Sequence, residues 1–493
     1  MLLHAGRDGG PSGAGGRFQH GVASGDPLTT QVVLWTRVTP PAGHAAAAPV
    51  EVRWRIASDE RLSSPVRTGT VRTSALRDYT VKIDATGLEP GRPYYYAFEY
   101  AGEQSPIGRT KTLPAARVER VRLASVSCAN YPAGFFNVYR RLANRDDVDA
   151  VVHLGDYIYE FANGVYGDGS ALGRVPTPAG EAVTLADYRA RYATYRGDPD
   201  LQAAHRRHPF ITVWDDHEVA NNWWTGGAIN HDLLDGDWRV RKTVAIQAYL
   251  EWMPVRESGP GAFHLYRQFR IGSLVDLVML DTRSFRDKQP ANADELNDPS
   301  RTMLGAVQEA WLIERLRASQ KAGTTWRLIG QQILFAPLTP PGMRVQNPDV
   351  WDGYPAARAR ITDALARGGI TNVAVLTGDV HSSWALDIPR NRSTYDGKTG
   401  AGSIAVELVT PAISSPPLFT DAALRGASSL LRLFTPHLKF LDGDNHGYVL
   451  LDVTRERVLA DWYFVPTVTE RTDAESKAAS FVCERGSSRL TKA

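Results

Sequence analysis

Apolar and polar positions alternate through the first part of the chain, from about residue 17 to residue 114. The apolar runs are short, rich in Val, Tyr and Trp, and separated by turn residues. Such alternation is typical of antiparallel strands that bury one face, so this region is predicted to form a β-sandwich. The expected strands cover residues 31–38, 50–56, 66–74, 79–84 and 94–100.

Beyond residue 121 the pattern changes, because strand-like apolar runs alternate with stretches of helical periodicity. This alternation indicates an α/β domain, with sheets packed face to face between helices and a closing hairpin at 447–452 and 458–465. In one helix, Leu304, Val307 and Trp311 share a face that we expect to pack in the core. The other expected strands lie at 121–128, 274–281, 326–332 and 404–409, and the expected helices at 136–143, 185–207, 238–251 and 302–319.

The 493 residues are predicted to divide into four parts, which is consistent with a length above that of a usual single domain. Residues 88–94 resemble the Leu-x-Pro-x-x-x-Tyr corner of fibronectin type III domains, so the sandwich is expected to be fibronectin-like. The expected parts are a flexible Gly-rich lead at 1–16, the sandwich at 17–114, the α/β domain at 118–470 and a C-terminal tail at 471–493.

Three apolar runs end abruptly at side chains that bind metals, at residues 148–160, 210–218 and 373–382. The carboxyl ends of strands in an open α/β sheet meet at one edge, where such folds place their sites. These side chains are therefore expected to converge, and we predict a centre that holds more than one metal ion.

The densest cluster is the run Asp215, Asp216, His217 and Glu218, directly after one predicted strand. Burying several charges without cations would cost several kcal/mol for each unpaired group. A solvated acidic loop is the alternative, and the neighbouring tryptophans argue against it. Asn222 and the residue before it add neutral oxygen atoms of the kind that calcium accepts.

The other two strand ends, together with the end of the strand at 121–128, contribute further potential ligands. Asp156 and Tyr159 follow one strand, Asp379 and His381 follow the second, and Cys128 follows the strand at 121–128. Each has a simpler interpretation: a turn aspartate, a core tyrosine, a structural histidine or a small buried thiol. Phenolate is a hard ligand suited to ferric iron, and thiolate is a second metal ligand in the same set.

Two arginines end another strand, in the sequence Asp-Thr-Arg-Ser-Phe-Arg at 281–286. Arg283 and Arg286 could clamp phosphate oxygens, since guanidinium forks match that geometry, with surface ion pairing as the alternative. Asn130, two residues after Cys128, is a further candidate for contact with substrate.

Composition excludes several classes. Hydrophobic residues at 43% and charged residues at 22% are ordinary values for a globular protein, and the net charge of +2 provides no basic surface for nucleic acid. Two cysteines, Cys128 and Cys483, do not indicate a disulfide framework. No run of eighteen apolar residues is present, so no transmembrane segment is expected.

Taken in order, these motifs resemble the alkaline phosphatase D family, which is related to the purple acid phosphatases. The resemblance covers residues 18–465 and implies a metallophosphoesterase-type αββα sandwich preceded by the β-sandwich. The motifs are Ser-Cys-x-Asn at 127–130, Gly-Asp-x-Ile-Tyr-Glu at 155–160, Leu-x-Asp-Tyr-Arg-x-Arg-Tyr at 185–192, Trp-Asp-Asp-His-Glu at 214–218, Asp-x-Arg-Ser-x-Arg at 281–286 and Gly-Asp-Val-His-Ser at 378–382.

The resemblance also implies ferric iron and calcium as cofactors. It assigns Cys128, Asp156, Tyr159 and His381 to iron, with Asp156 bridging to calcium. Asp215 or Asp216, an asparagine of the 221–222 pair, represented by Asn222, and Asp379 would complete the calcium shells. His217 and Arg283 would be catalytic, and Asn130 and Arg286 would bind substrate.

The implied reaction is hydrolysis of a small phosphate ester by a metal-bound hydroxide, because a bound cation lowers the pKa of water. Within the family, phospholipase D-type action on phospholipids or other phosphodiesters is the alternative. A phosphoesterase loaded with zinc or manganese is another, and a calcium-dependent binding protein with a silent metal site is a third, from a different class.

Localisation has two conflicting indications. The family is typically exported through the twin-arginine route, so the resemblance implies a secreted or cell-surface protein. The first sixteen residues contain neither a twin-arginine pair nor a charged segment followed by an apolar one, so no signal peptide is expected in this sequence.

Overall fold

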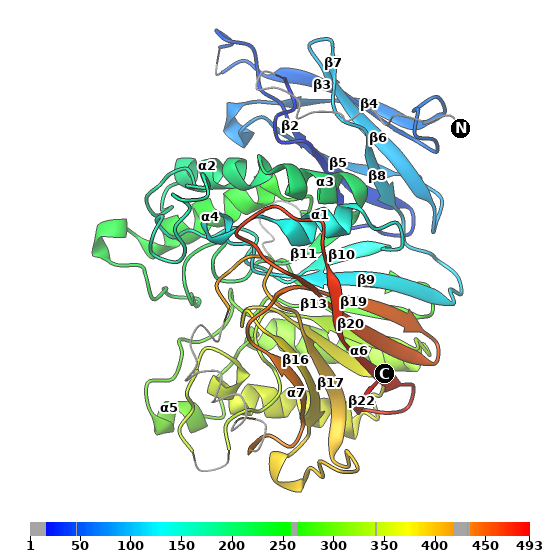
Figure 1. The fold of residues 1–493 in the computed structure, drawn as a ribbon, viewed down its shortest axis with the longest axis vertical. Coiled ribbons are helices and arrows are strands. Elements are labelled where there is room, and N and C mark those ends of the chain that lie inside the picture. The colour runs from blue at the N-terminus through cyan, green and yellow to red at the C-terminus, as the bar shows by residue number, and fades with distance from the viewer. Residues whose placement is uncertain (1–15, 46, 258–263, 341–342, 418–430, 432–433) are drawn as a thin grey trace.

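The computed structural model describes residues 16–45, 47–257, 264–340, 343–417, 431 and 434–493. Residues 1–15, nearly all of the expected Gly-rich lead, lie outside the described residues. Two large sheets pack face to face, with helices against their outer sides and a smaller sheet at the N-terminal end (Figure 1). The predicted α/β class with an N-terminal β-sandwich is confirmed. Among the described helices, none has the length and apolar composition that a membrane span requires.

The first large sheet has ten strands within the described residues, and its central strands β9, β10, β11 and β1 are parallel. Strands β9, β10 and β11 carry the predicted ligands just past their carboxyl ends. In spatial order the strands are β22 (Leu490–Lys492), β21 (Ser476–Glu484), β20 (Arg457–Val465), β19 (His446–Thr454), β9 (Arg120–Val126), β10 (Ala150–His153), β11 (Pro209–Thr212), β1 (Val22–Gly25), β2 (Gln31–Arg37) and β5 (Thr80–Thr86).

The second large sheet has seven described strands, with β13, β14, β15 and β17 parallel. Its inner face joins the first sheet in one continuous apolar core, since Leu277 and Leu376 cluster with Val151 and Ile211. In spatial order the strands are β12 (Arg267–Ile271), β13 (Val275–Met279), β14 (Trp326–Gly330), β15 (Val373–Thr377), β17 (Ser403–Val409), β16 (Ser383–Pro389) and β18 (Leu438–Asp442).

Helices cover the outer face of each large sheet. On the first sheet lie α1 (Asn137–Ala143), α2 (Leu185–Arg196), α3 (Pro199–Arg207) and α4 (Trp238–Trp252) (Figure 1). On the second lie α6 (Gly305–Lys321) and α7 (Pro355–Arg367), whose apolar residues cluster with the outer residues of that sheet, and the short α5 (Ala293–Asn297) contacts α7.

The N-terminal β-sandwich shares a sheet with the rest of the molecule. Its smaller sheet contains β4 (Pro65–Thr73), β3 (Val50–Ala57), β6 (Pro93–Tyr100), β7 (Glu103–Gln104) and β8 (Gly108–Lys111). The opposing layer is β1, β2 and β5, which form one edge of the ten-stranded sheet because β1 pairs in parallel with β11. At residues 88–94 the Tyr94 hydroxyl accepts a hydrogen bond from the Glu89 backbone N–H at 2.8 Å, as in a tyrosine corner.

The structure corrects the prediction of a C-terminal tail. Residues expected to form the tail contain β21 and β22, which extend the ten-stranded sheet beside β20. Phe481 and Cys483 on β21 are buried in the main core. Val482 between them is buried as well, so β21 is covered on both faces near its end, and β22 forms the edge of the sheet.

Two helix predictions also need correction. The single helix expected at 185–207 is two helices, because Asp198 caps the second and Pro199, which lacks the N–H of a continuing helix, begins it. In α6, Leu304 is buried but Val307 is 76% exposed, so the expected face is wrong. The buried positions of α6 are Gln308, Leu312, Leu316 and Ser319.

Trp35 on β2 links the N-terminal region to the helices of the larger domain. Its side chain is fully buried, its Nε1 donates a hydrogen bond to the Glu251 carbonyl at 2.8 Å, and the Arg196 guanidinium lies 4.0 Å from its ring centroid. We expect Trp35→Ala to destabilise the protein by about 3–5 kcal/mol, because it leaves a cavity and an unpaired carbonyl. The shift of the urea-unfolding midpoint measures this cost.

The matched control is Leu76→Ala, on the same side of the molecule but 84% exposed. It should change stability by no more than about 0.5 kcal/mol. Equal effects of the two substitutions would show that Trp35 does not join the two regions.

Candidate metal centre

The predicted ligands meet at one rim, where the two large sheets face each other. Cys128 follows β9, Asp156 follows β10 and Asp215 follows β11, all in the ten-stranded sheet. Arg283 follows β13 and Asp379 follows β15 in the second sheet. Parallel strands from both sheets therefore direct their carboxyl ends to the same place.

The backbone at this rim is unusually strained. Cys128, Asp156, Asn222, Asp379 and His381 have φ values of 61°, 53°, 51°, 63° and 49°, in the left-handed region that non-glycine residues seldom adopt. Such strain persists only where surrounding structure enforces it, and it concentrates at functional sites.

Gly155 allows the loop after β10 to approach the loop after β11. Its φ is 109°, and a Cβ atom there would lie 2.4 Å from the Cβ of Asp215 and 2.6 Å from its backbone nitrogen. Any larger residue would push the two loops apart. The glycine of the Gly-Asp motif therefore brings Asp156 close to Asp215.

One group of potential ligands combines four different side chains. Ligand atoms of Cys128, Asp156 and His381 lie within 4.8 Å of one another. The Tyr159 hydroxyl lies 2.9 Å from Asp156 Oδ2 and 3.0 Å from His381 Nε2, and it accepts a hydrogen bond from Ser415 Oγ at 2.7 Å. A thiol, a phenol, a carboxylate and an imidazole thus surround one point.

Two further groups adjoin the first. Asp156, Asp216 and His217 form one, and Asp215, Asp216 and Asp379 form the other, each with ligand atoms within 4.8 Å. Asp156 belongs to the first two groups and Asp216 to the last two. The described residues therefore contain a chain of three adjoining groups, linked by shared carboxylates.

Burial sets the protonation of the first group. It raises the pKa of Asp156, Cys128 and Tyr159 well above their ordinary values, and the charges of neighbouring acids add to the effect. It lowers the pKa of His381 to about 3, which keeps the imidazole neutral. A neutral imidazole offers a lone pair to a metal ion, whereas the thiol and phenol become ligands once a cation displaces their protons.

His217 has the opposite electrostatic setting. Burial disfavours its charged form, but the carboxylates of Asp216 and Glu160 outweigh burial and hold its pKa well above the ordinary value. Its Nδ1 lies 2.8 Å from Glu160 Oε2, and Nε2 lies 3.9 Å from Asp216 Oδ2. These carboxylates therefore favour the protonated form of His217.

The donor set fits bound cations. The buried or half-buried carboxyl groups outnumber the guanidinium groups that face them, Arg283 and Arg286. Three buried oxygen atoms of the site, Asp215 Oδ2, Asp216 Oδ1 and Asn130 Oδ1, have no hydrogen-bond partner, which is costly unless a ligand is bound there. The carboxyl groups are those of Asp156, Glu160, Asp215, Asp216, Glu218, Asp349 and Asp379.

Glu218 also lies in the cluster, although the sequence analysis gave it no role. Its carboxylate accepts hydrogen bonds from the backbone N–H groups of Asp156 at 3.1 Å, Tyr157 at 2.5 Å and Asp215 at 2.7 Å. It thereby joins the loop after β10 to the loop after β11. Burial raises its pKa to about 8.

Glu160, Tyr166 and Asp349 are further residues that sequence reasoning missed. Glu160 accepts hydrogen bonds from the Asn221 backbone N–H at 2.7 Å and from Asn230 Nδ2 at 2.9 Å, in addition to its contact with His217. The Tyr166 hydroxyl lies 2.9 Å from His381 Nδ1. Glu160 stands in a motif that was recognised, whereas Tyr166 and Asp349 lie in loops without an apolar pattern.

The remaining predicted residues lie around the cluster. The Asn222 backbone N–H donates to Asp216 Oδ2 at 2.7 Å, and the Asn130 carboxamide donates to the Tyr166 carbonyl. Arg283 and Arg286 are fully buried, so the surface ion pairs considered from sequence are absent for both. Both guanidiniums pair instead with Asp349 inside the protein.

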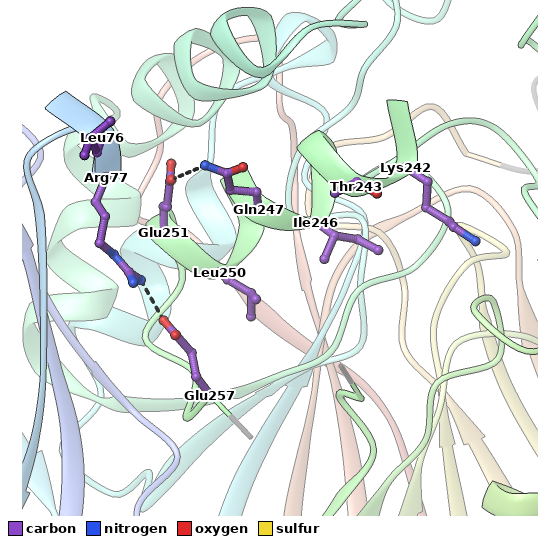
Figure 2. A pocket seen from close by; sticks show the side chains of 9 residues that line it. All are labelled: Leu76, Arg77, Lys242, Thr243, Ile246, Gln247, Leu250, Glu251 and Glu257. Carbon is purple, nitrogen blue, oxygen red and sulfur yellow. Dashed lines mark hydrogen bonds and ion pairs between the residues drawn. The ribbon is translucent and has the colours of Figure 1, made fainter. Parts of the chain in front are cut away.

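A separate groove of about 540 Å³ lies between the short helix η1 (Ala75–Arg77) and α4, and none of the predicted site residues lines it (Figure 2). Its charged groups already have partners: Arg77 pairs with Glu257 at 2.7 Å, and Glu251 accepts from Gln247 at 2.9 Å. The groove therefore has no evident link to the chemistry of the strand ends.

Comparisons with known proteins give one consistent result. Residues 123–462 match the family model described as PhoD-like phosphatase, and residues 6–114 match the N-terminal domain of PhoD-like phosphatase. The chain is 39% identical to alkaline phosphatase D of Bacillus subtilis (strain 168), across 96% of this chain and 82% of the relative. A solved structure of PhoD superposes with a TM-score of 0.88 at 37% identity, covering 98% of this chain and 93% of that one.

The raised carboxyl pKa values predict how cations and pH act together on stability. Burial raises the pKa of Glu218 to about 8 and of Asp379 to about 7, so without cations the folded protein binds more protons than the unfolded chain. Stability of the metal-free protein should therefore fall as pH rises from about 5 through about 8. Calcium, which needs ionised carboxylates, should raise the melting temperature more at pH 8.5 than at pH 6.

The measurement is a thermal melt of chelator-treated protein at both pH values, with and without added calcium. Magnesium at the same concentration controls for ionic strength. A calcium effect that is equal at the two pH values, or larger at pH 6, would contradict the interpretation of Asp379 and the carboxyl groups beside it as cation ligands.

Proposed function

The chain belongs to the PhoD-like phosphatase family, and we propose that it hydrolyses phosphate esters at the cluster formed by the ends of β9, β10, β11 and β15. The position of Asp156 carries this proposal, because this one carboxylate is shared by the first two potential ligand groups. A carboxylate that bridges two cations is a recurring arrangement in two-metal phosphoesterases, which act on both the attacking and the leaving oxygen.

We infer ferric iron for the first group and calcium for the neighbouring carboxylates. Cys128, Asp156, Tyr159 and His381 offer the thiolate and phenolate that suit iron. Asp215, Asp216 and Asp379 offer only oxygen, which suits calcium, and Asn222 lies beside them. When bound, these cations would acidify a water molecule and neutralise charge on the phosphoryl oxygens.

The protein itself supplies orientation and a fixed positive group. Glu160 holds Nδ1 of His217, which leaves Nε2 to face the cluster. A protonated imidazole fixed in this way can donate a hydrogen bond to a phosphoryl oxygen and a proton to the leaving group. Glu218 holds the loops that carry Asp156 and Asp215, so the ligands keep their spacing during turnover.

A phospholipid or another phosphodiester is the second candidate substrate. The loop that carries Ile229 and the 3₁₀ helix η3 (Leu233–Asp235) is attached to the site, because Asn230 contacts Glu160 and the Ile229 N–H donates to the Asn221 carbonyl. On this loop Ile229, Leu233 and Leu234 are 63%, 97% and 95% exposed. Apolar side chains this exposed beside a site suit contact with a lipid surface.

The function is tested by measuring metal content with elemental mass spectrometry and then hydrolysis rates on a monoester, a diester and phosphatidylcholine. Iron with calcium and turnover of at least one ester are expected. Zinc or manganese in place of iron and calcium would overturn the metal assignment. Full metal loading without hydrolysis of any ester would overturn the enzymatic proposal in favour of a binding protein.

Replacing Asp156 tests the bridging role. Asp156→Asn should reduce kcat by at least about a thousandfold and lower the metal content, because a neutral amide cannot bridge two cations. Asp149→Asn, at the opposite end of the same strand, is the matched control and should retain nearly full activity. Near-normal activity of the folded Asp156→Asn protein would show that the bridging assignment is wrong.

The exposed leucines test the second substrate. Leu233→Ser combined with Leu234→Ser should lower the rate on phosphatidylcholine vesicles about tenfold or more. Two leucine side chains that leave water for the lipid would contribute several kcal/mol to binding at the vesicle surface. The rate on a soluble aryl phosphate should be unchanged. Equal rates on vesicles before and after the substitutions would exclude this loop from lipid binding.

A further inference from the structure

Arg283 is the most heavily engaged charged side chain of the site. It is fully buried, and its Nε pairs with Asp215 Oδ1. Its Nη1 lies 2.7 Å from Asp349 Oδ2, and its Nη2 lies 3.2 Å from Asp379 Oδ1 and 3.3 Å from Asp216 Oδ1. Each nitrogen of the guanidinium therefore faces a carboxylate.

We propose that Arg283 is a positioning residue, which aligns the cation-binding carboxylates and does not contact the substrate phosphate. This proposal rests on the proposed metal-dependent phosphatase function. It replaces the direct role in phosphate binding that the sequence pattern suggested for this residue.

The hydrogen bonds show how the alignment works. Arg283 donates a hydrogen bond to Oδ1 of Asp215, whereas Oδ2 of the same carboxylate is buried without a hydrogen-bond partner. It also donates a hydrogen bond to Oδ1 of Asp379, which follows a strand of the second sheet. The planar guanidinium fixes the angle between the two carboxylates, so that their remaining oxygens can face a common cation.

Asp349 holds Arg283 in place from the far side. Its Oδ1 accepts from Arg286 Nη2 at 2.7 Å and from Gln289 Nε2 at 2.5 Å, while Oδ2 accepts from Arg283. Although burial raises it, the charges of the two arginines hold the pKa of Asp349 below its usual value, which keeps Asp349 ionised.

Arg286 is anchored in turn, because its Nε donates to the Trp223 carbonyl at 2.8 Å. For Arg283 to reach a substrate phosphate, it would have to leave buried, ionised partners without a counter-charge. Breaking such a buried pair is strongly unfavourable. The side chain is therefore held where it touches carboxylates and is shielded from the solvent that brings substrate.

The decisive variant is Arg283→Lys, because lysine keeps the positive charge but loses the planar fork. Removing the positive charge of Arg283 would by itself strengthen calcium binding, but lysine keeps that charge. A weaker calcium affinity in Arg283→Lys would therefore report the lost geometry of the guanidinium. We expect the dissociation constant for calcium, measured by titration calorimetry, to rise about 10–100-fold. At saturating calcium, KM for an aryl phosphate should stay within about twofold of the wild-type value.

Asp349→Glu is the second variant: it keeps the negative charge, moves the carboxylate that holds Arg283, and leaves Arg283 and the three potential ligand groups intact. This variant should also weaken calcium binding, because Arg283 is no longer held in place by the Asp349 carboxylate. It also keeps the proposal testable if Arg283→Lys does not fold, which circular dichroism would show. Arg267→Lys is the matched control: Arg267 pairs with buried Asp26 at 2.6 Å outside the site, and calcium affinity should not change.

Two results would overturn the proposal. Unchanged calcium affinity in Arg283→Lys, or in Asp349→Glu if the first variant is unfolded, would remove the positioning role. A tenfold or larger rise in KM at saturating calcium would show that Arg283 contacts substrate. Because calcium affinity needs no turnover, a wild-type protein that binds calcium but hydrolyses no ester would refute only the proposed function.

Discussion

Electrostatic repulsion between buried carboxylates is the constraint on which this structure depends. Asp156, Asp215, Asp216 and Asp379 approach one another at a rim that two sheets enclose, where water cannot screen their charges. The Glu218 hydrogen bonds and the close contact at Gly155 hold them there against that repulsion, and the positive φ values are the backbone strain that this arrangement costs. The fold thus keeps together ionisable groups that bound protons, Arg283 or cations can stabilise.

The opposition of two sheets explains how one site draws on so many strands. Each sheet alone presents its ligands along a line, but face-to-face packing places the lines side by side. Arg283 and Asp379 come from one sheet and Asp215 from the other, and a single guanidinium contacts both. The site therefore lies between the two sheets, and the distances between its side chains depend on the apolar core that fixes the separation of the sheets.

The sequence predicted those parts that have a local cause. Apolar runs ending at Asp156, Asp215 and Asp379 identified the strand ends, and parallel pairing brings such ends together. Glu160 and Asp349 could not be assigned in this way, because their roles arise from contacts with residues far along the chain. The break at Pro199 was readable from the sequence, whereas β1, only four residues long, is defined by its pairing with β11.

The pairing of β1 with β11 also bears on how the chain folds during synthesis. Residues 17–114 leave the ribosome before Pro209–Thr212, so one edge of their sheet stays unpaired until that strand has been made. Contacts of such long sequence separation delay the final folding step and leave a strand edge open to wrong partners. Asp215 of the candidate metal centre follows β11, so the centre adjoins a strand that takes part in this long-range pairing.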